Sequence, residues 1–115
     1  MSKPYAVVAS PLFKLSQQRL SAFLTEQYSA ALAKTTLAHI KLRIMQDLVA
    51  HPSVAPVSER LLALGIADYR QWQVDQHNVL FYQIDEAKKR IELLLLMDSR
   101  QSLQKLLFEL MLLNW

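Results

Sequence analysis

The chain has 115 residues, 52% of them hydrophobic and 20% charged, and its formal net charge is +3. A chain of this length forms one domain with a continuous core, and its apolar content excludes intrinsic disorder. Cysteine is absent, which excludes disulfide scaffolds, thiolate nucleophiles and thiolate metal sites. We therefore expect a single domain over residues 1–115.

The N-terminus and the apolar runs argue against secretion and membrane insertion. The first residues lack the apolar stretch and the small-residue cleavage site of a secretory signal. The longest apolar runs, 93–97 and 110–113, fall far short of the roughly 20 residues that a membrane-spanning helix needs. We expect a cytoplasmic protein that does not contact a membrane.

The charge is distributed unevenly along the chain. Residues 1–46 contain six basic residues and one acidic residue, a net charge of +5, whereas the remaining residues have a net charge of −2. A basic front half suits an acidic protein partner or a phosphate backbone. A solvated helix face gives the same pattern, and both interpretations remain open.

The first half of the chain predicts a strand followed by two helices. Residues 3–9 have the aromatic and β-branched character of a strand. Ser10-Pro11 is a helix-start signal, because the serine hydroxyl can cap a free N–H group and proline suits the first helical position. We expect a first helix to about Gln27, a turn at Tyr28-Ser29 and a second helix over 29–50, where apolar residues recur with helical spacing.

The second half predicts a three-stranded meander. A short helical turn over 59–64 ends at Gly65, the only glycine of the chain. Alternation of polar and apolar residues predicts strands over 69–74 and 79–84. The segment 91–97, apolar at every position except Glu92, predicts a third strand, which should lie centrally in the sheet and be covered by helices.

The C-terminal segment predicts a helix with two apolar stripes. Asp98-Ser99 is expected to cap this helix, with Gln101 in a capping-box position. One stripe can cover the sheet and consists of Leu103, Leu106, Leu107 and Leu110. The second stripe consists of Phe108, Leu112 and Trp115. Burial of a large apolar side chain is worth roughly 1.5 to 3 kcal/mol, so we expect the second stripe to pack against a partner protein or a second copy of the chain.

The predicted order of elements is that of an α+β fold, with an N-terminal strand, a helical hairpin, a three-stranded antiparallel meander and a C-terminal helix. This order resembles the RelE/ParE superfamily of bacterial toxins over essentially the whole chain. The segment Asn78-Val79-Leu80-Phe81-Tyr82-Gln83-Ile84-Asp85 is similar to the family's YRVFYRVD strand, and Met97-Asp98-Ser99-Arg100-Gln101 is similar to its HSRQD strand end. The chain departs from the pattern where the family's usual histidine is replaced by Asp98 or Met97, and in its apolar C-terminal tail.

The resemblance implies candidate catalytic residues for a ribonuclease. In ribosome-dependent ribonucleases of the superfamily, basic side chains near the end of the last strand polarise the phosphate, often with a tyrosine or histidine. Arg100 lies in the corresponding region, and Tyr82 and Arg70 could face the same side of the sheet. No histidine is expected beside them as a general base, because the three histidines fall in a helix, at a helix end and in a turn, at His39, His51 and His77.

Structural roles are open for the same side chains. Arg100 can pair with Asp98 or Glu109, and Tyr82 can pack in the core, as most strand aromatics do.

Two groups of basic residues are candidates for contacts with partners. Lys34 and Lys41 lie seven residues apart on one helix face, where they can steer an acidic antitoxin segment. The cluster Lys88-Lys89-Arg90 is a candidate phosphate contact or, alternatively, a solvated turn. The sequence contains no phosphate-binding loop, metal-ligand cluster or Ser/His/Asp arrangement, so we expect no cofactor and no metal.

The resemblance leaves three functions open. The first is a ParE-like toxin that inhibits its target, DNA gyrase, by binding and is neutralised by a cognate antitoxin. The second is a RelE-like endonuclease that cleaves messenger RNA on the ribosome. The third is an interaction module that keeps the fold without toxicity.

Overall fold

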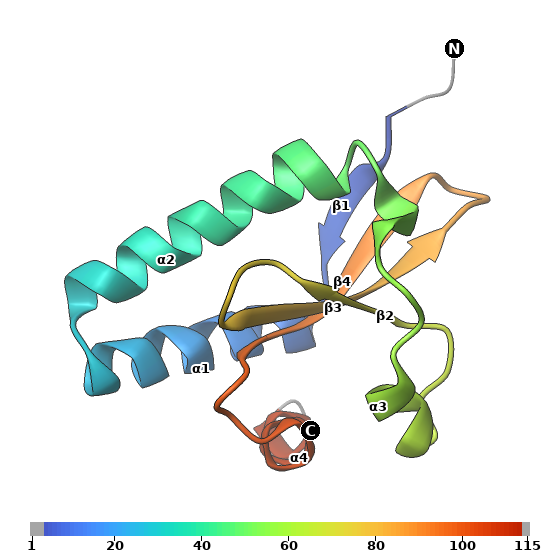
Figure 1. Cartoon of the computed structure of the whole chain (residues 1–115). Coiled ribbons are helices and arrows are strands. Elements are labelled where there is room, and N and C mark those ends of the chain that lie inside the picture. The colour runs from blue at the N-terminus through green and yellow to red at the C-terminus, as the bar shows by residue number, and fades with distance from the viewer. Residues whose placement is uncertain (1–3, 114–115) are drawn as a thin grey trace.

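The structure, a computed structural model, describes residues 4–113 and contains one four-stranded sheet covered by helices on both faces (Figure 1). The strand order is β1-β4-β3-β2. The predicted α+β fold class is confirmed, including the central position of the apolar third strand of the meander.

The front half begins with β1 (Ala6–Ala9), α1 (Pro11–Gln27) and α2 (Ala30–Arg43), which form a strand and a helical hairpin. The Ser10 hydroxyl accepts a hydrogen bond from the Phe13 N–H, and the Ser29 hydroxyl accepts one from the Leu32 N–H. These caps confirm the predicted start of the first helix and the turn at Tyr28-Ser29.

The second helix does not continue to residue 50 as an α-helix. A π-helical turn, η1 (Ile44–Leu48), follows α2, and the chain then leaves the helix at His51. Local apolar spacing does not distinguish an i→i+4 turn from an i→i+5 turn, because both keep the buried Ile44 and Leu48 on the core side.

The back half contains a 3₁₀ turn, η2 (Pro52–Val54), the short helix α3 (Glu59–Ala63) and the strands β2 (Arg70–Gln73), β3 (Asn78–Asp85) and β4 (Arg90–Asp98). It ends in α4 (Leu103–Leu113). The three strands pair antiparallel, as predicted. Gly65 adopts a φ of 82°, which only glycine accepts readily, and it follows the end of α3.

Two details of the topology differ from, or add to, the sequence prediction. β1 pairs in parallel with β4, so the first and last strands of the chain are neighbours. α4 is capped by Ser102, whose hydroxyl accepts from the Lys105 N–H, and not by Asp98-Ser99. Gln101 does reach back to the Asp98 N–H, but Asp98 itself binds Arg100 and is not available as a cap.

Two apolar clusters stabilise the sheet, one on each face. α1 and α2 cover the first face, and the cluster there includes Leu20, Ile40, Trp72 and Tyr82. α3 and α4 cover the second face, where Phe81 and Leu95 contact the four leucines of the predicted inner stripe of α4. Phe81 and Tyr82 serve opposite faces because consecutive side chains alternate along a strand, and a bulge at this point leaves Leu94 of β4 without a partner in β3.

Within residues 4–113, no helix has the length and apolarity to cross a lipid bilayer.

Candidate functional site

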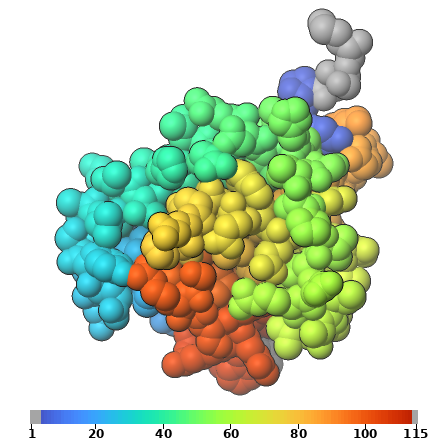
Figure 2. Space-filling view, viewed as in Figure 1, coloured from blue at the N-terminus to red at the C-terminus, as the bar shows by residue number. Residues whose placement is uncertain are grey.

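A groove opens where three segments meet: the turn between α1 and α2, the turn between β2 and β3, and the end of β4 (Figure 2). Its volume is about 520 Å³. Its walls combine the apolar side chains of Leu24 and Leu32 with polar groups from all three segments. Arg100 lies in this groove. Of the three catalytic candidates that the sequence analysis names, it alone is exposed to solvent.

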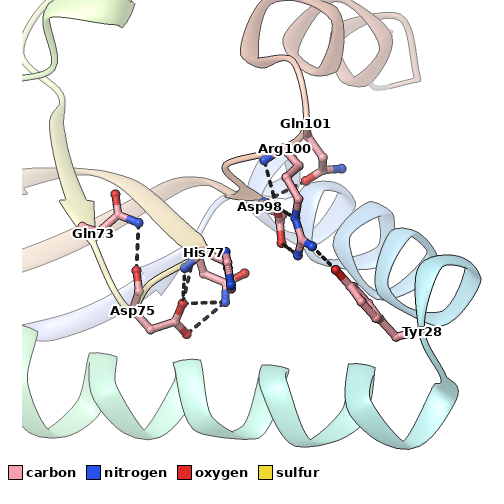
Figure 3. A network of polar contacts seen from close by, with 8 residues as sticks. Tyr28, Gln73, Asp75, His77, Asp98, Arg100 and Gln101 are labelled. Atoms are coloured by element: carbon pink, nitrogen blue, oxygen red, sulfur yellow. Dashed lines mark hydrogen bonds and ion pairs between the residues drawn. The ribbon is translucent and has the colours of Figure 1, made fainter.

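Arg100 is held in the groove by a carboxylate and a phenol (Figure 3). Its guanidinium donates to both Asp98 oxygens, at 2.7 and 2.6 Å, and also to the Tyr28 hydroxyl. The Asp98 side chain is 1% exposed and that of Arg100 is 41% exposed. A bidentate pair of this kind fixes the guanidinium plane and compensates its charge. The structural pairing with Asp98 is therefore confirmed, whereas Glu109 lies beside Arg19 instead.

Aromatic rings also contact the Arg100 guanidinium. Its central carbon lies 5.2 Å from the ring centroid of Tyr28 and 5.7 Å from that of Phe23. Both rings belong to the end of α1 and its cap, so Arg100 joins the helical hairpin to the end of β4.

The opposite wall of the groove is the turn between β2 and β3, organised by Asp75. This carboxylate accepts hydrogen bonds from the backbone N–H groups of His77 and Asn78 and from the Asn78 side-chain amide, all at 2.9 Å. Burial opposes ionisation of Asp75, but these hydrogen bonds outweigh it and lower its pKa from the usual 3.8. Asp75 therefore adds a fixed negative charge to the groove.

Two histidines line the same groove as Arg100, which corrects the expectation that none would lie near it. His39 reaches it from α2 and His77 from the turn between β2 and β3, and both are exposed. They are 38 positions apart in the sequence, and no local pattern places them together. Periodicity could only indicate that His39 lies off the apolar face of its helix.

Tyr82 and Arg70 do not line this groove. Arg70 of β2 and Tyr82 of β3 are directly paired in the sheet, so their side chains lie on the same face, as predicted. Tyr82 is fully buried, its hydroxyl donates to the Pro52 carbonyl at 2.5 Å, and burial raises its pKa above the usual 10.0. Arg70 donates to the Ala55 carbonyl at 2.5 Å. Both side chains fasten the segment that follows α2, and neither is placed to act with Arg100.

The basic cluster Lys88-Lys89-Arg90 forms the turn between β3 and β4. Lys89 pairs with Glu86 at 3.2 Å, and Arg90 lies 3.7 Å from Asp85 and 3.6 Å from Glu92. Neighbouring carboxylates thus compensate two of the three charges, which disfavours the phosphate-contact interpretation. Lys88 is exposed.

The residues predicted to bind a partner are exposed wherever the structure describes them. Phe108 is 66% and Leu112 is 52% exposed on α4, and Lys34 and Lys41 are exposed on α2. Trp115 lies outside the described residues. Among residues 4–113, no group of three or more His, Asp or Glu side chains is arranged to hold a metal ion.

No family model matches the chain, and no curated protein is significantly similar to it in sequence. The fold is similar to that of a chain in the crystal structure of the toxin-antitoxin complex RelBE2 from Mycobacterium tuberculosis. The two chains superpose with a TM-score of 0.62 and 18% sequence identity, over 84% of this chain and 99% of the other. The protein therefore shares its fold with a chain of that complex.

Proposed function

We propose that this protein is the toxin of a type II toxin-antitoxin pair and that it inhibits its target by binding. The likeness of its fold to a chain of the RelBE2 complex supports the toxin assignment. Binding in place of cleavage is supported by one observation above all, the bidentate Asp98 carboxylate that already occupies the Arg100 guanidinium.

The charge balance of the groove supports the same choice. Its ionisable lining consists of one guanidinium, two carboxylates and two histidines, from Arg100, Asp98, Asp75, His39 and His77. With neutral histidines the sum is negative, which repels a phosphodiester backbone. A ribonuclease of this superfamily needs cationic side chains that are free to polarise the phosphate.

The antitoxin is expected to cover the second apolar stripe of α4, the one that contains Phe108 and Leu112. Phe108, Met111 and Leu112 are 66%, 61% and 52% exposed, and contiguous exposed apolar residues of this kind mark protein-protein surfaces. DNA gyrase is the target that the sequence resemblance implies. In this proposal the protein acts in the cytoplasm.

Inducible expression of the chain alone in a bacterial host tests the proposal. Colony counts should fall after induction, and plasmids from arrested cells should show altered supercoiling on chloroquine gels. Normal growth with soluble, folded protein would contradict the toxin assignment and leave an interaction module with this fold.

A messenger-RNA endonuclease is the second candidate, favoured by the two histidines in the Arg100 groove. His39 and His77 supply imidazoles, the side chains that most often act as general acids and bases. In that case Arg100 would have to exchange Asp98 for the phosphate. Cleavage of ribosome-bound message in induced cells, with loss of cleavage in His39→Ala or His77→Ala, would establish this candidate.

A further inference from the structure

The wall of the groove opposite Arg100 has hydrogen-bonding capacity that the chain itself does not use. The Asp75 Oδ1 atom accepts hydrogen bonds from the backbone N–H groups of His77 and Asn78 and from the Asn78 side-chain amide. Within residues 4–113, the Asp75 Oδ2 atom accepts only from that same amide, at 2.9 Å. Because a carboxylate oxygen has more than one lone pair, Oδ2 keeps a free acceptor position.

Asn78 adds an acceptor without a donor. The residue is 4% exposed and lines the groove, and its side-chain nitrogen donates to both Asp75 oxygens, which fixes the orientation of the amide. Its oxygen, Oδ1, is buried and has no hydrogen-bond partner in the part of the chain that the structure describes. A buried amide oxygen without a donor is unfavourable, so a ligand that brings an N–H group to this wall gains free energy.

The Asp75 carboxylate also lacks a cationic partner. Within residues 4–113, no lysine or arginine forms an ion pair with it. The titratable side chains beside it in the groove are those of His39 and His77, and both residues are exposed. With neutral histidines the lining has a net negative charge, so the groove attracts a cation.

The wall on the other side shows which cation fits. There the Asp98 carboxylate and the Tyr28 hydroxyl, a charged acceptor and a neutral one, bind the guanidinium of Arg100 (Figure 3). Asp75 and Asn78 offer the same combination, a carboxylate oxygen and an amide oxygen, on two side chains that are hydrogen-bonded to each other. A guanidinium presents several N–H groups in fixed directions and can bind two acceptors at once, whereas a lysine ammonium is a point charge.

We propose that this wall binds an arginine side chain of the protein that the chain inhibits, with the guanidinium on Asp75 and Asn78. The aliphatic part of the arginine would lie along Leu32, Thr35 and Thr36, which line the same groove. The second apolar stripe of α4, which is assigned to the antitoxin, does not line it. That the arginine belongs to the target rests on the proposed function, whereas the affinity of the groove for arginine does not.

An NMR chemical-shift titration of the full chain, with N-acetyl-arginine methylamide as the probe, tests the proposal. The probe should shift the backbone amides of His77 and Asn78 and the Asn78 side-chain amide, with a dissociation constant of about 1 to 10 mM for a single side chain. N-acetyl-citrulline methylamide has nearly the same shape without the charge and should bind about tenfold more weakly. The lysine analogue should bind about threefold more weakly, because its ammonium lacks the fork of N–H groups.

A matched pair of variants tests the role of the carboxylate. Asp75→Asn keeps an oxygen that can accept from the His77 and Asn78 N–H groups but removes the charge, and it should weaken arginine binding about tenfold. Asp68→Asn makes the same charge change at an exposed position outside the groove, where asparagine tolerates the φ of 70°, and it should bind arginine like the wild-type chain. If Asp75→Asn does not fold, the comparison of arginine with citrulline on the wild-type chain decides.

Three results would overturn the proposal. One is the absence of shifts at His77 and Asn78 with tens of millimolar probe. Another is equal binding of the citrulline compound. The third is a larger shift of the same amides with an RNA trinucleotide than with the arginine probe, which would assign the groove to nucleic acid.

The titration and the growth assay fail separately. Growth arrest by a chain that does not bind arginine would contradict this inference and leave the toxin assignment intact. Specific arginine binding by a chain that does not arrest growth would confirm the affinity of the groove and contradict the toxin assignment.

Discussion

Tyr82 and Tyr28 occupy opposite environments. Tyr82 stands in β3 with its ring fully buried and its hydroxyl on the Pro52 carbonyl, 30 residues earlier in the chain. Tyr28 caps α1 with its side chain half exposed and its hydroxyl on the Arg100 guanidinium. A tyrosine hydroxyl thus stabilises the interior in one region and lines an open groove in the other.

This difference separates stability from candidate function. Arg70 and Tyr82, which the resemblance brought together with Arg100, belong to the first region and hold the segment after η1 in place. Arg100, His39 and His77 belong to the second region and face solvent. Substitutions in the two regions should therefore differ in what they change.

The largest expected effect on stability is that of Tyr82→Phe. This substitution leaves the partly buried Pro52 carbonyl without its donor, and loss of such a hydrogen bond costs about 1 to 2 kcal/mol. Urea denaturation followed by circular dichroism should show a lower midpoint with an unchanged m-value. An unchanged midpoint would mean that water replaces the hydroxyl at this site.

A smaller effect on stability is expected when the Asp75 carboxylate is protonated at low pH. Its pKa is lower in the folded chain than the usual 3.8, so its contribution to stability is fully present above about pH 4 and is lost as pH falls through the folded value. Asp75→Asn should flatten the dependence of the urea midpoint on pH below about pH 4. His77→Ala, in the same turn, should leave that dependence intact, because the bond to Asp75 comes from the backbone N–H.

The smallest effect is expected from Tyr28→Phe, the matched partner of Tyr82→Phe. Its hydroxyl is at the surface and Arg100 keeps both Asp98 oxygens, so the free energy of unfolding should change by less than about 0.5 kcal/mol. The same denaturation measurement checks this. A loss as large as that of Tyr82→Phe would show that the hydroxyl-guanidinium contact fastens the hairpin to β4.

Local signals were sufficient for most of the secondary structure. The cap and proline at Ser10-Pro11, the serine at the hairpin turn, Gly65 and the alternating strands each predict an element that the structure contains. The uninterrupted apolar run 93–97 of β4 predicts its central position, because a strand covered on both faces has apolar side chains on both sides.

Long-range pairing and the composition of the groove were beyond local signals. The parallel pairing of β1 with β4 joins residues more than 80 positions apart, and nothing in either strand encodes the register alone. His39 joins His77 only because α2 passes over the turn between β2 and β3. The resemblance identified Arg100 as a candidate. Only the geometry of the end of β4 shows that the Asp98 carboxylate compensates the charge of its guanidinium.

The mode of action is the central claim, and mapping RNA 5′ ends in growth-arrested cells tests it most directly. Cells that express the wild-type chain, the Arg100→Ala variant or an empty vector would be compared. If the toxin acts by binding, the wild-type chain arrests growth without new ends inside ribosome-bound messages. Codon-specific ends that appear with the wild-type chain and vanish with Arg100→Ala would contradict that account and show that Arg100 releases Asp98 to act on RNA.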